Sequence, residues 1–226
     1  MERKTFEDSL LDPLEWMKKD KEEVERLLGP ETAAMVGFDQ RTPHHCYTLF
    51  EHTLRTVEGL PKDCSVLLRT AAFFHDIGKP ASAKEVKGRL TFHGHAAVSA
   101  QTAEPILKDL GYTAEEAGRI LFYIAHHDDF ISWCLPEESE MAAGRMAVTK
   151  ENVKKYAEKV KRGNASLFSE EPECFIWDSL LDLSRADIGA QSALVYVGGV
   201  LADSMEHKLI KLRQIEEYLQ ELCAPA

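Results

Sequence analysis

The apolar run Val66–Phe74 is the feature that most constrains how this chain can fold. Its hydrophobic residues fall on nearly every side of a helix, a pattern typical of a helix buried at the centre of a protein. The run leads directly into His75 and Asp76, and Gly78 then ends the helix. Two adjacent ionisable groups in such a place cost free energy unless something pairs with them. The sequence therefore predicts a central helix that presents a histidine and a carboxylate to a partner, most simply a divalent cation.

The rest of the chain is also predicted to be helical. Asp12 and Pro13 have the form of an N-cap followed by proline at the first helical position, and Thr113 with Glu116 forms a capping box. Strand patterns are nearly absent and no internal repeat occurs, so we expect an all-α fold. Residues 81–90 are expected to form a polar loop. The expected helices span about 12–28, 46–57, 66–74, 95–110, 113–127, 149–161, 175–190 and 204–222.

The length of 226 residues fits a single domain over 1–226, with a helical N-terminal segment at 1–36 and an insertion at 136–172. The insertion contains Lys150–Arg162, which carries six basic and two acidic residues. This segment is either a lid that meets an anionic substrate or, as we favour, an ordinary solvated helix face. The amphipathic helix of the closing segment, 203–226, packs either on the core or at the seam of a homodimer.

Composition excludes several classes of protein. The net charge of −11 argues against binding of long nucleic acid, although a metal-lined pocket can still attract a small anion. No apolar stretch is long enough to cross a membrane and the N-terminus lacks an apolar signal core, so a cytoplasmic protein is expected. The five cysteines are scattered without a Cys-x-x-Cys pair, which disfavours a disulfide framework and a thiolate zinc site.

Candidate metal ligands recur along the predicted helices, and eight of the nine histidines lie between His44 and His127. His52 lies beside the apolar stripe of its helix, where the alternative is a core histidine bonded to a backbone carbonyl. Asp187 continues a core-facing stripe that contains Leu180 and Leu183. An arginine partner at Arg185 is the alternative, but side chains two residues apart on a helix point to different sides. We therefore interpret His52 and Asp187 as ligands.

Two further histidines lie at helix ends: His95 opens one helix and His126 closes another. In a helical bundle both ends can face a central site, whereas each residue alone could equally be a solvated helix-end histidine. We assign both as metal ligands because they accompany His75 and Asp76. The choice between His126 and its neighbour His127 stays open at this point, and we place His93 and His127 among the orienting or substrate-binding residues.

The ordered series His52, His75-Asp76 and Asp187 resembles the HD superfamily of metal-dependent phosphohydrolases. Within it, the chain is most similar to the HD domain of bacterial CCA-adding enzymes. The similarity covers about 37–130 and 175–192. It includes Gly37-Phe38-Asp39-Gln40, His44-His45, Tyr47 to Leu54, Leu68 to Pro80, and Phe92 to His95 with Ser99. We expect a free-standing relative, because no Gly-Ser loop with paired acidic residues marks a nucleotidyltransferase head.

This resemblance implies an HD-domain helical bundle, with the insertion preceding the helix that carries the last ligand. It also implies one metal held by His52, His75, Asp76 and Asp187, with Asp76 bridging to a second metal held by His95 and His126. A nitrogen-rich ligand set suits Mn, Fe, Ni, Co or Zn. The implied reaction is hydrolysis of a phosphomonoester or phosphodiester of a nucleotide or other small molecule, through attack of a metal-bound hydroxide.

Asp76 and Lys79 are the expected catalytic residues in this reaction. Lys79 follows the helix end and would take phosphate charge, with an exposed lysine near a helix C-terminus as its alternative. Arg185 is a weaker candidate for the same role. Two other functions remain open: a di-iron oxygenase on the same ligand set, and a non-catalytic binding module that keeps the fold.

Overall fold

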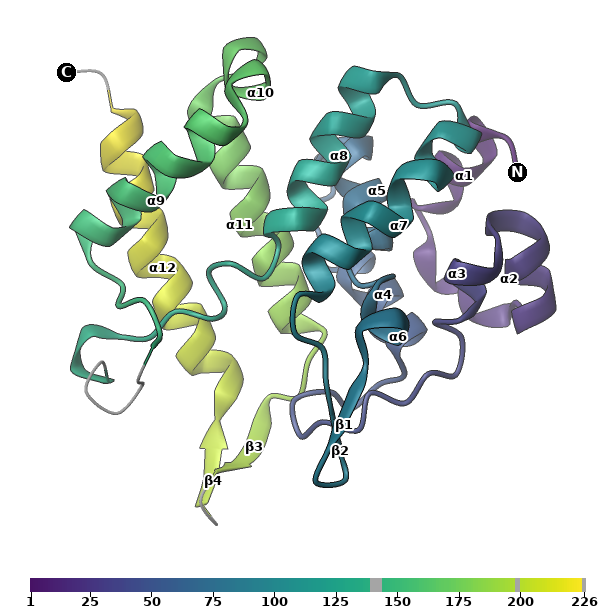
Figure 1. Ribbon diagram of the computed structural model, residues 1–226, viewed down its shortest axis with the longest axis horizontal. Helices are drawn as coiled ribbons and strands as arrows, with labels where there is room; N and C mark the ends of the chain where they lie inside the picture. Colours follow the sequence, from purple (N-terminus) through teal and green to yellow (C-terminus); the bar gives the residue numbers. More distant parts are fainter. Residues whose placement is uncertain (139–143, 198–199, 225–226) are drawn as a thin grey trace.

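The computed structural model describes residues 1–138, 144–197 and 200–224 (Figure 1). Helices dominate this part of the chain, which confirms the all-α prediction. The α-helices are α1 (Arg3–Ser9), α2 (Lys21–Leu28), α3 (Pro30–Ala33), α4 (Leu49–Glu58), α5 (Val66–Phe74), α6 (Lys79–Ser82), α7 (His95–Leu110), α8 (Ala114–His126), α9 (Lys150–Gly163), α10 (Ala165–Glu170), α11 (Glu173–Gly189) and α12 (Ser204–Cys223). Short 3-10 helices are η1 (Pro13–Lys18) and η2 (Pro136–Glu138).

Two antiparallel hairpins complete the described structure and project from one end of it (Figure 1). The first pairs β1 (Lys84–Val86) with β2 (Arg89–Thr91), and the second pairs β3 (Leu194–Val197) with β4 (Val200–Asp203). The first hairpin replaces the polar loop expected at 81–90. Its two-residue turn places both Lys87 (φ 51°) and Gly88 (φ 80°) in the left-handed region, which suits the twist of a tight hairpin.

Helix α5 is at the centre of the fold, as its apolar run predicts. Its residues from Leu68 to Phe74 are buried, and α4, α7, α8 and α11 all contact it. The N-terminal segment closes one side through aromatic packing, with the Phe6 ring centroid 5.2 Å and the Trp16 ring centroid 5.3 Å from that of Phe73. This packing fixes the direction in which the end of α5 delivers His75 and Asp76.

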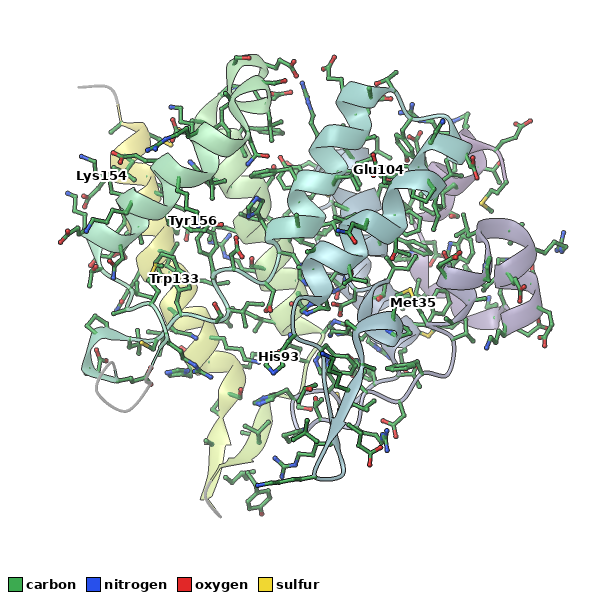
Figure 2. All side chains as sticks on the ribbon, in the orientation of Figure 1. Met35, His93, Glu104, Trp133, Lys154 and Tyr156 are labelled. Carbon is green, nitrogen blue, oxygen red and sulfur yellow. The ribbon has the colours of Figure 1, made fainter. Side chains whose placement is uncertain are left out.

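Helix α11 joins the two parts of the bundle. It packs against α4, α5 and α8 on one side and against α12 on the other (Figure 1). The buried Lys211 of α12 donates hydrogen bonds to the carbonyl oxygens of Ile131 (3.0 Å) and Trp133 (2.6 Å). The Trp133 ring in turn packs 5.5 Å from that of Tyr156 in α9 (Figure 2). These contacts fasten the segment after α8 to the C-terminal helix.

The first predicted helix is wrong in its extent. Instead of one helix over 12–28, the chain forms η1, leaves the helical conformation at Lys19, and starts α2 after Asp20. Asp20 accepts a hydrogen bond from the Glu23 N–H at 2.8 Å. A second N-cap signal therefore restarts the helix, while burial of Trp16 against Phe73 sets the path of the preceding turn.

Within the predicted insertion at 136–172 the described residues form η2, α9 and α10, so the helix expected at 149–161 is present and a further short one follows it. Residues 139–143 of the insertion and 225–226 of the closing segment lie outside the described structure. Lysines of α9 form surface ion pairs with carboxylates, among them Lys155 with Glu151 at 2.5 Å, which is the behaviour of a solvated helix face. Among the described helices, none combines the length and apolar character needed to cross a bilayer.

The turn after α5 touches the start of α7 through Gly78. A Cβ atom at this position would lie 2.4 Å from the Ser99 backbone nitrogen and 2.9 Å from the His95 carbonyl oxygen. The Gly78 N–H also donates to the Ser99 hydroxyl at 2.9 Å. Only glycine permits this approach, which sets the position of His95 relative to Asp76.

We expect Gly78→Ala to lower the free energy of unfolding by about 3 kcal/mol, because the backbone of α7 must move to admit a methyl group. Gly118→Ala is a matched control: Gly118 lies within α8, and nothing lies within 4 Å of the added methyl. The control should gain about 0.5–1 kcal/mol from helix propensity. Urea unfolding monitored by circular dichroism measures both values. Equal changes in the free energy of unfolding for the two substitutions would show that the close approach of Gly78 to α7 does not affect stability.

Candidate metal centre

Six buried or nearly buried side chains from five helical segments converge beside the end of α5. His75 caps the C-terminus of α5 and Asp76 follows it, while His127 caps the C-terminus of α8. His95 is the first residue of α7, His52 lies within α4, and Asp187 lies near the end of α11. We call this set the His/Asp cluster: His52, His75, Asp76, His95, His127 and Asp187.

Asp76 lies between two pairs of imidazoles. Its Oδ2 atom is 3.3 Å from His52 Nε2 and 3.2 Å from His75 Nε2. Its Oδ1 atom is 3.2 Å from His95 Nε2 and 3.6 Å from His127 Nε2. One carboxylate thus offers a separate oxygen to each pair, an arrangement suited to bridging two cations.

Asp187 completes the first of these groups. Its Oδ1 atom is 3.1 Å from His52 Nε2 and 3.9 Å from His75 Nε2. Ligands about 2.1 Å from one cation and at right angles to each other are about 3.0 Å apart. Two such ligands opposite each other are about 4.2 Å apart, so the separations of 3.1 and 3.9 Å both lie within the range for atoms that share an ion.

The four histidines of the cluster are all oriented by backbone carbonyls. The Nδ1–H groups of His75 and His127 donate at 2.7 Å to the carbonyl oxygens three residues earlier, those of Ala72 and Ile124. His95 Nδ1 donates to Phe92 at 3.0 Å and His52 Nδ1 donates to Ala190 at 3.0 Å, by the same kind of bond. A carbonyl can only accept, so Nδ1 carries the proton and Nε2 is left as the donor atom for a cation.

Four polar atoms in this cluster are buried and lack a hydrogen-bond partner. They are His52 Nε2, His75 Nε2 and both carboxylate oxygens of Asp76. The neighbouring atoms are close, at 3.1 to 3.3 Å, but do not meet the geometry that a hydrogen bond requires. Buried polar atoms are almost always paired. Divalent transition metals fit this set, because they would satisfy all four atoms at once.

The close packing of imidazoles and carboxylates shifts the pKa values of the cluster residues. Burial opposes protonation of His52, but the carboxylates of Asp187 and Asp76 outweigh it and raise its pKa to about 9. Burial likewise opposes a charge on His127, and Asp76 raises its pKa to about 9. Burial opposes ionisation of Asp76, yet His75 and Lys79 hold its pKa well below the usual range. Without a metal, protons on imidazoles compensate the buried carboxylates.

Lys79 is buried beside the cluster and is not the exposed helix-end lysine of the alternative interpretation. Its Nζ atom is 2.7 Å from Asp76 Oδ2 and donates a hydrogen bond to Gln40 Oε1 at 2.9 Å. The contact with Asp76 is an ion pair without hydrogen-bond geometry, because Asp76 Oδ2 has no hydrogen-bond partner. The ammonium group is therefore held at the edge of the cluster with part of its donor capacity unused.

The structure corrects the assignment of His126, since it places His127 in the cluster instead. His126 Nδ1 contacts Asp129 Oδ2 at 2.7 Å, and its ring packs 4.8 Å from that of Phe122. Adjacent residues near a helix end point about 100° apart, so only one of the two can face inward. His127, which the sequence analysis placed among the orienting or substrate-binding residues, is therefore reassigned to the candidate metal ligands.

Two other expected site residues are not brought into the cluster. Arg185 pairs with Asp182 at 3.1 Å and with Glu216 of α12 at 2.6 Å, on another side of α11 from Asp187. A role for Arg185 in substrate binding is therefore not supported. His93 is exposed in the loop between β2 and α7 (Figure 2), and its role stays a prediction.

Sequence reasoning missed other residues around the cluster. The His45 ring lies 4.9 Å from that of His52, and burial lowers the pKa of His45 to about 2. Gln40 binds Lys79, and Gln191 Nε2 donates to Asp187 Oδ1 at 3.0 Å. Gln40, His45 and Gln191 all lie in stretches that resemble the HD superfamily, but their contacts depend on distant parts of the chain.

We expect His127→Ala to remove at least one bound metal equivalent, because His127 Nε2 faces Asp76 Oδ1. His126→Ala is the matched control and should keep the full metal content, since His126 faces Asp129. Plasma mass spectrometry of the purified variants gives the stoichiometry. The geometry would be contradicted if His126→Ala lost metal while His127→Ala retained it.

Metal affinity should rise with pH from about 6 to about 9, because a cation must displace the protons of His52 and His127. The same raised pKa values stabilise the metal-free fold below about pH 6.5, and this contribution is lost as pH rises through about 9. Calorimetric titration in two buffers of different ionisation enthalpy should reveal proton release at about pH 7.5. Equal apparent enthalpies in the two buffers would contradict this assignment of protons.

Comparison with known proteins finds a family model and relatives that match part of the chain. The model of the HD domain family matches residues 44–162, which contain every cluster residue except Asp187. A CC-adding tRNA nucleotidyltransferase of Thermus thermophilus is 39% identical over 121 residues, which are 50% of this chain and 26% of that protein. An A-adding tRNA nucleotidyltransferase of Deinococcus radiodurans is 33% identical over 103 residues, 43% of this chain and 24% of that protein.

The aligned region thus spans about a quarter of the length of each of these two relatives. The family match covers more than half of this chain and includes the turn where His75 and Asp76 meet the other imidazoles. The chain belongs to the HD domain family.

Proposed function

We propose that this protein is a metal-dependent phosphohydrolase that acts on a phosphomonoester or phosphodiester of a nucleotide or another small molecule. The observation that carries the proposal is the set of buried nitrogen and oxygen atoms on His52, His75 and Asp76 that have no hydrogen-bond partner and could bind a metal. Membership of the HD domain family supports a hydrolytic role for such a set. The activities named for the two tRNA nucleotidyltransferases belong to proteins that share only a part with this chain.

Two groups of residues would hold the metals. His52, His75 and Asp187 would hold one, His95 and His127 the other, and Asp76 would contact both. When bound, divalent cations stabilise charge on phosphate oxygens and lower the pKa of water. The nitrogen-rich donor set suits Mn, Fe, Ni, Co or Zn better than Mg, which prefers oxygen ligands.

Lys79 would serve a phosphate that reaches the cluster. Lys79 is 5% exposed. Its ammonium group donates a hydrogen bond to Gln40 and lies beside the Asp76 carboxylate, which would contact both cations. An ammonium held at this point binds a phosphate oxygen without having to be ordered during the reaction. Asp76 and Lys79 therefore keep their proposed catalytic roles, with Asp76 positioning the cations and Lys79 binding the substrate.

A panel of phosphomonoesters and phosphodiesters tests the proposal, with protein loaded separately with Mn, Fe, Ni, Co and Zn. Released phosphate or alcohol that depends on metal and disappears in Asp76→Ala supports hydrolysis. Oxygen consumption by the iron-loaded protein without turnover of the panel would favour the oxygenase alternative. A protein that binds no metal would favour the non-catalytic binding module.

We expect Lys79→Met to lower kcat/KM by about a hundredfold, the usual effect of removing one preorganised donor from a developing oxyanion. Its metal content should not fall, because loss of the ammonium leaves Asp76 more negative. Lys84→Met, at an exposed position in β1, is the control and should keep wild-type kcat/KM. Steady-state kinetics on the best substrate of the panel measures kcat/KM for both variants. An unchanged kcat/KM in Lys79→Met would show that Lys79 has no role in the mechanism.

A further inference from the structure

Helix α12 contributes a second ammonium group near the His/Asp cluster. Lys208 Nζ donates a hydrogen bond to Gln191 Oε1 at 2.5 Å, and Gln191 Nε2 donates to Asp187 Oδ1 at 3.0 Å. One glutamine side chain therefore separates Lys208 from a carboxylate of the cluster. Lys208 lies beyond the region matched by the HD family model, so neither that match nor the proposed metal ligands account for it.

Lys208 is positioned much as Lys79 is. Each ammonium donates to the carbonyl oxygen of a glutamine, Gln40 for Lys79 and Gln191 for Lys208. The segments that carry these glutamines are joined, because the Ser192 N–H donates to the His44 carbonyl oxygen at 2.8 Å. The two lysines thus approach the cluster from separate elements, α6 and α12, and both are fixed by neighbouring segments.

The surroundings of Lys208 show that it shares the electrostatic environment of the cluster. Burial lowers the pKa of Lys208; Asp187 and Asp128 oppose this shift, whereas the charge of Lys79 adds to it. Carboxylates lie near both ammonium groups, Asp76 at Lys79 and Asp187 with Asp128 near Lys208, and offset part of their mutual repulsion; a bound anion would offset it further.

Both the Lys208 side and the Lys79 side of the cluster retain N–H groups that have no hydrogen-bond acceptor. Among the described residues, Lys208 Nζ makes only the hydrogen bond to Gln191, so its remaining N–H groups have no protein acceptor. Gln40 is 1% exposed and its Nε2 atom has no acceptor, because its Oε1 is turned to Lys79. The Gln40 donor belongs to the Lys79 side, whereas the free N–H groups of the partly buried Lys208 can reach the oxygens of a second phosphate.

We propose that Lys208 is a substrate-binding residue that binds a second phosphate group of the substrate, while Lys79 and the metals bind the phosphate that reacts. This inference rests on the proposed function of the cluster and narrows it to small molecules that carry two phosphate groups. The substrate class is then a bisphosphorylated nucleotide or a similar small bisphosphate. A simple phosphomonoester would leave Lys208 without a ligand.

The experiment measures binding of phosphonates, whose carbon–phosphorus bonds are not hydrolysed as esters are. The metal-loaded 226-residue protein is titrated with methylphosphonate and with propane-1,3-bisphosphonate, and its metal content is measured again after each titration. Binding is then independent of turnover. A failure of the proposed hydrolysis and a failure of the Lys208 proposal therefore give different results.

We expect the wild-type protein to bind the bisphosphonate about tenfold more tightly than methylphosphonate, the effect of one charge-assisted hydrogen bond. Lys208→Gln should lose this preference and keep its methylphosphonate affinity and metal content, and Lys208→Arg should restore much of it. Arg213→Gln, an equal charge change at an exposed position of α12, should keep the tenfold preference. The proposal is overturned if the wild-type protein shows no preference, or if Lys208→Gln retains it.

Discussion

Neutralising two buried carboxylates is the constraint on which the structure around the His/Asp cluster depends. Asp76 and Asp187 are 1% and 4% exposed, and a buried carboxylate without compensation is far more costly than any single packing contact. Imidazoles, Lys79, the ends of several helices and, through Gln191, Lys208 gather around them. Because Nε2 of His52, Nε2 of His75 and both Asp76 oxygens are left without hydrogen-bond partners, this gathering is completed by cations more naturally than by protons.

Much of this arrangement could be predicted from the chain alone. The all-round apolar character of α5 placed it at the centre, and its end placed His75 and Asp76 in the interior. The apolar stripe of α11 led to Asp187 by the same reasoning, since a carboxylate on a core-facing stripe needs a partner. Periodicity and burial are local properties of the sequence, so these predictions required no knowledge of how the helices pack.

The errors arose where local signals competed. The stripe of α8 contains Ala117, Ile120 and Ile124, and its continuation at the same helical spacing is His127, not His126. The rule that selected Asp187 would therefore have selected His127. The break before α2 has a different cause, because Asp20 is an N-cap only if the chain leaves the helical conformation at Lys19, and tertiary packing of Trp16 favours that path. The hydrogen bonds of Gln40 and Gln191 to the lysines join residues whose proximity no local pattern indicates.

The bonds from imidazole Nδ1 to carbonyl oxygens three residues earlier have a consequence for how this cluster can evolve. Two of the four rings, those of His75 and His127, are tied to a carbonyl within their own helix, so each inherits its direction from the rotational phase of that helix end. Insertion or deletion of one residue within α8 would rotate the ring of His127 by about 100°. Length variation among related chains should therefore be confined to the loops and hairpins between these helices, while the spacing between each helix core and its terminal histidine stays constant.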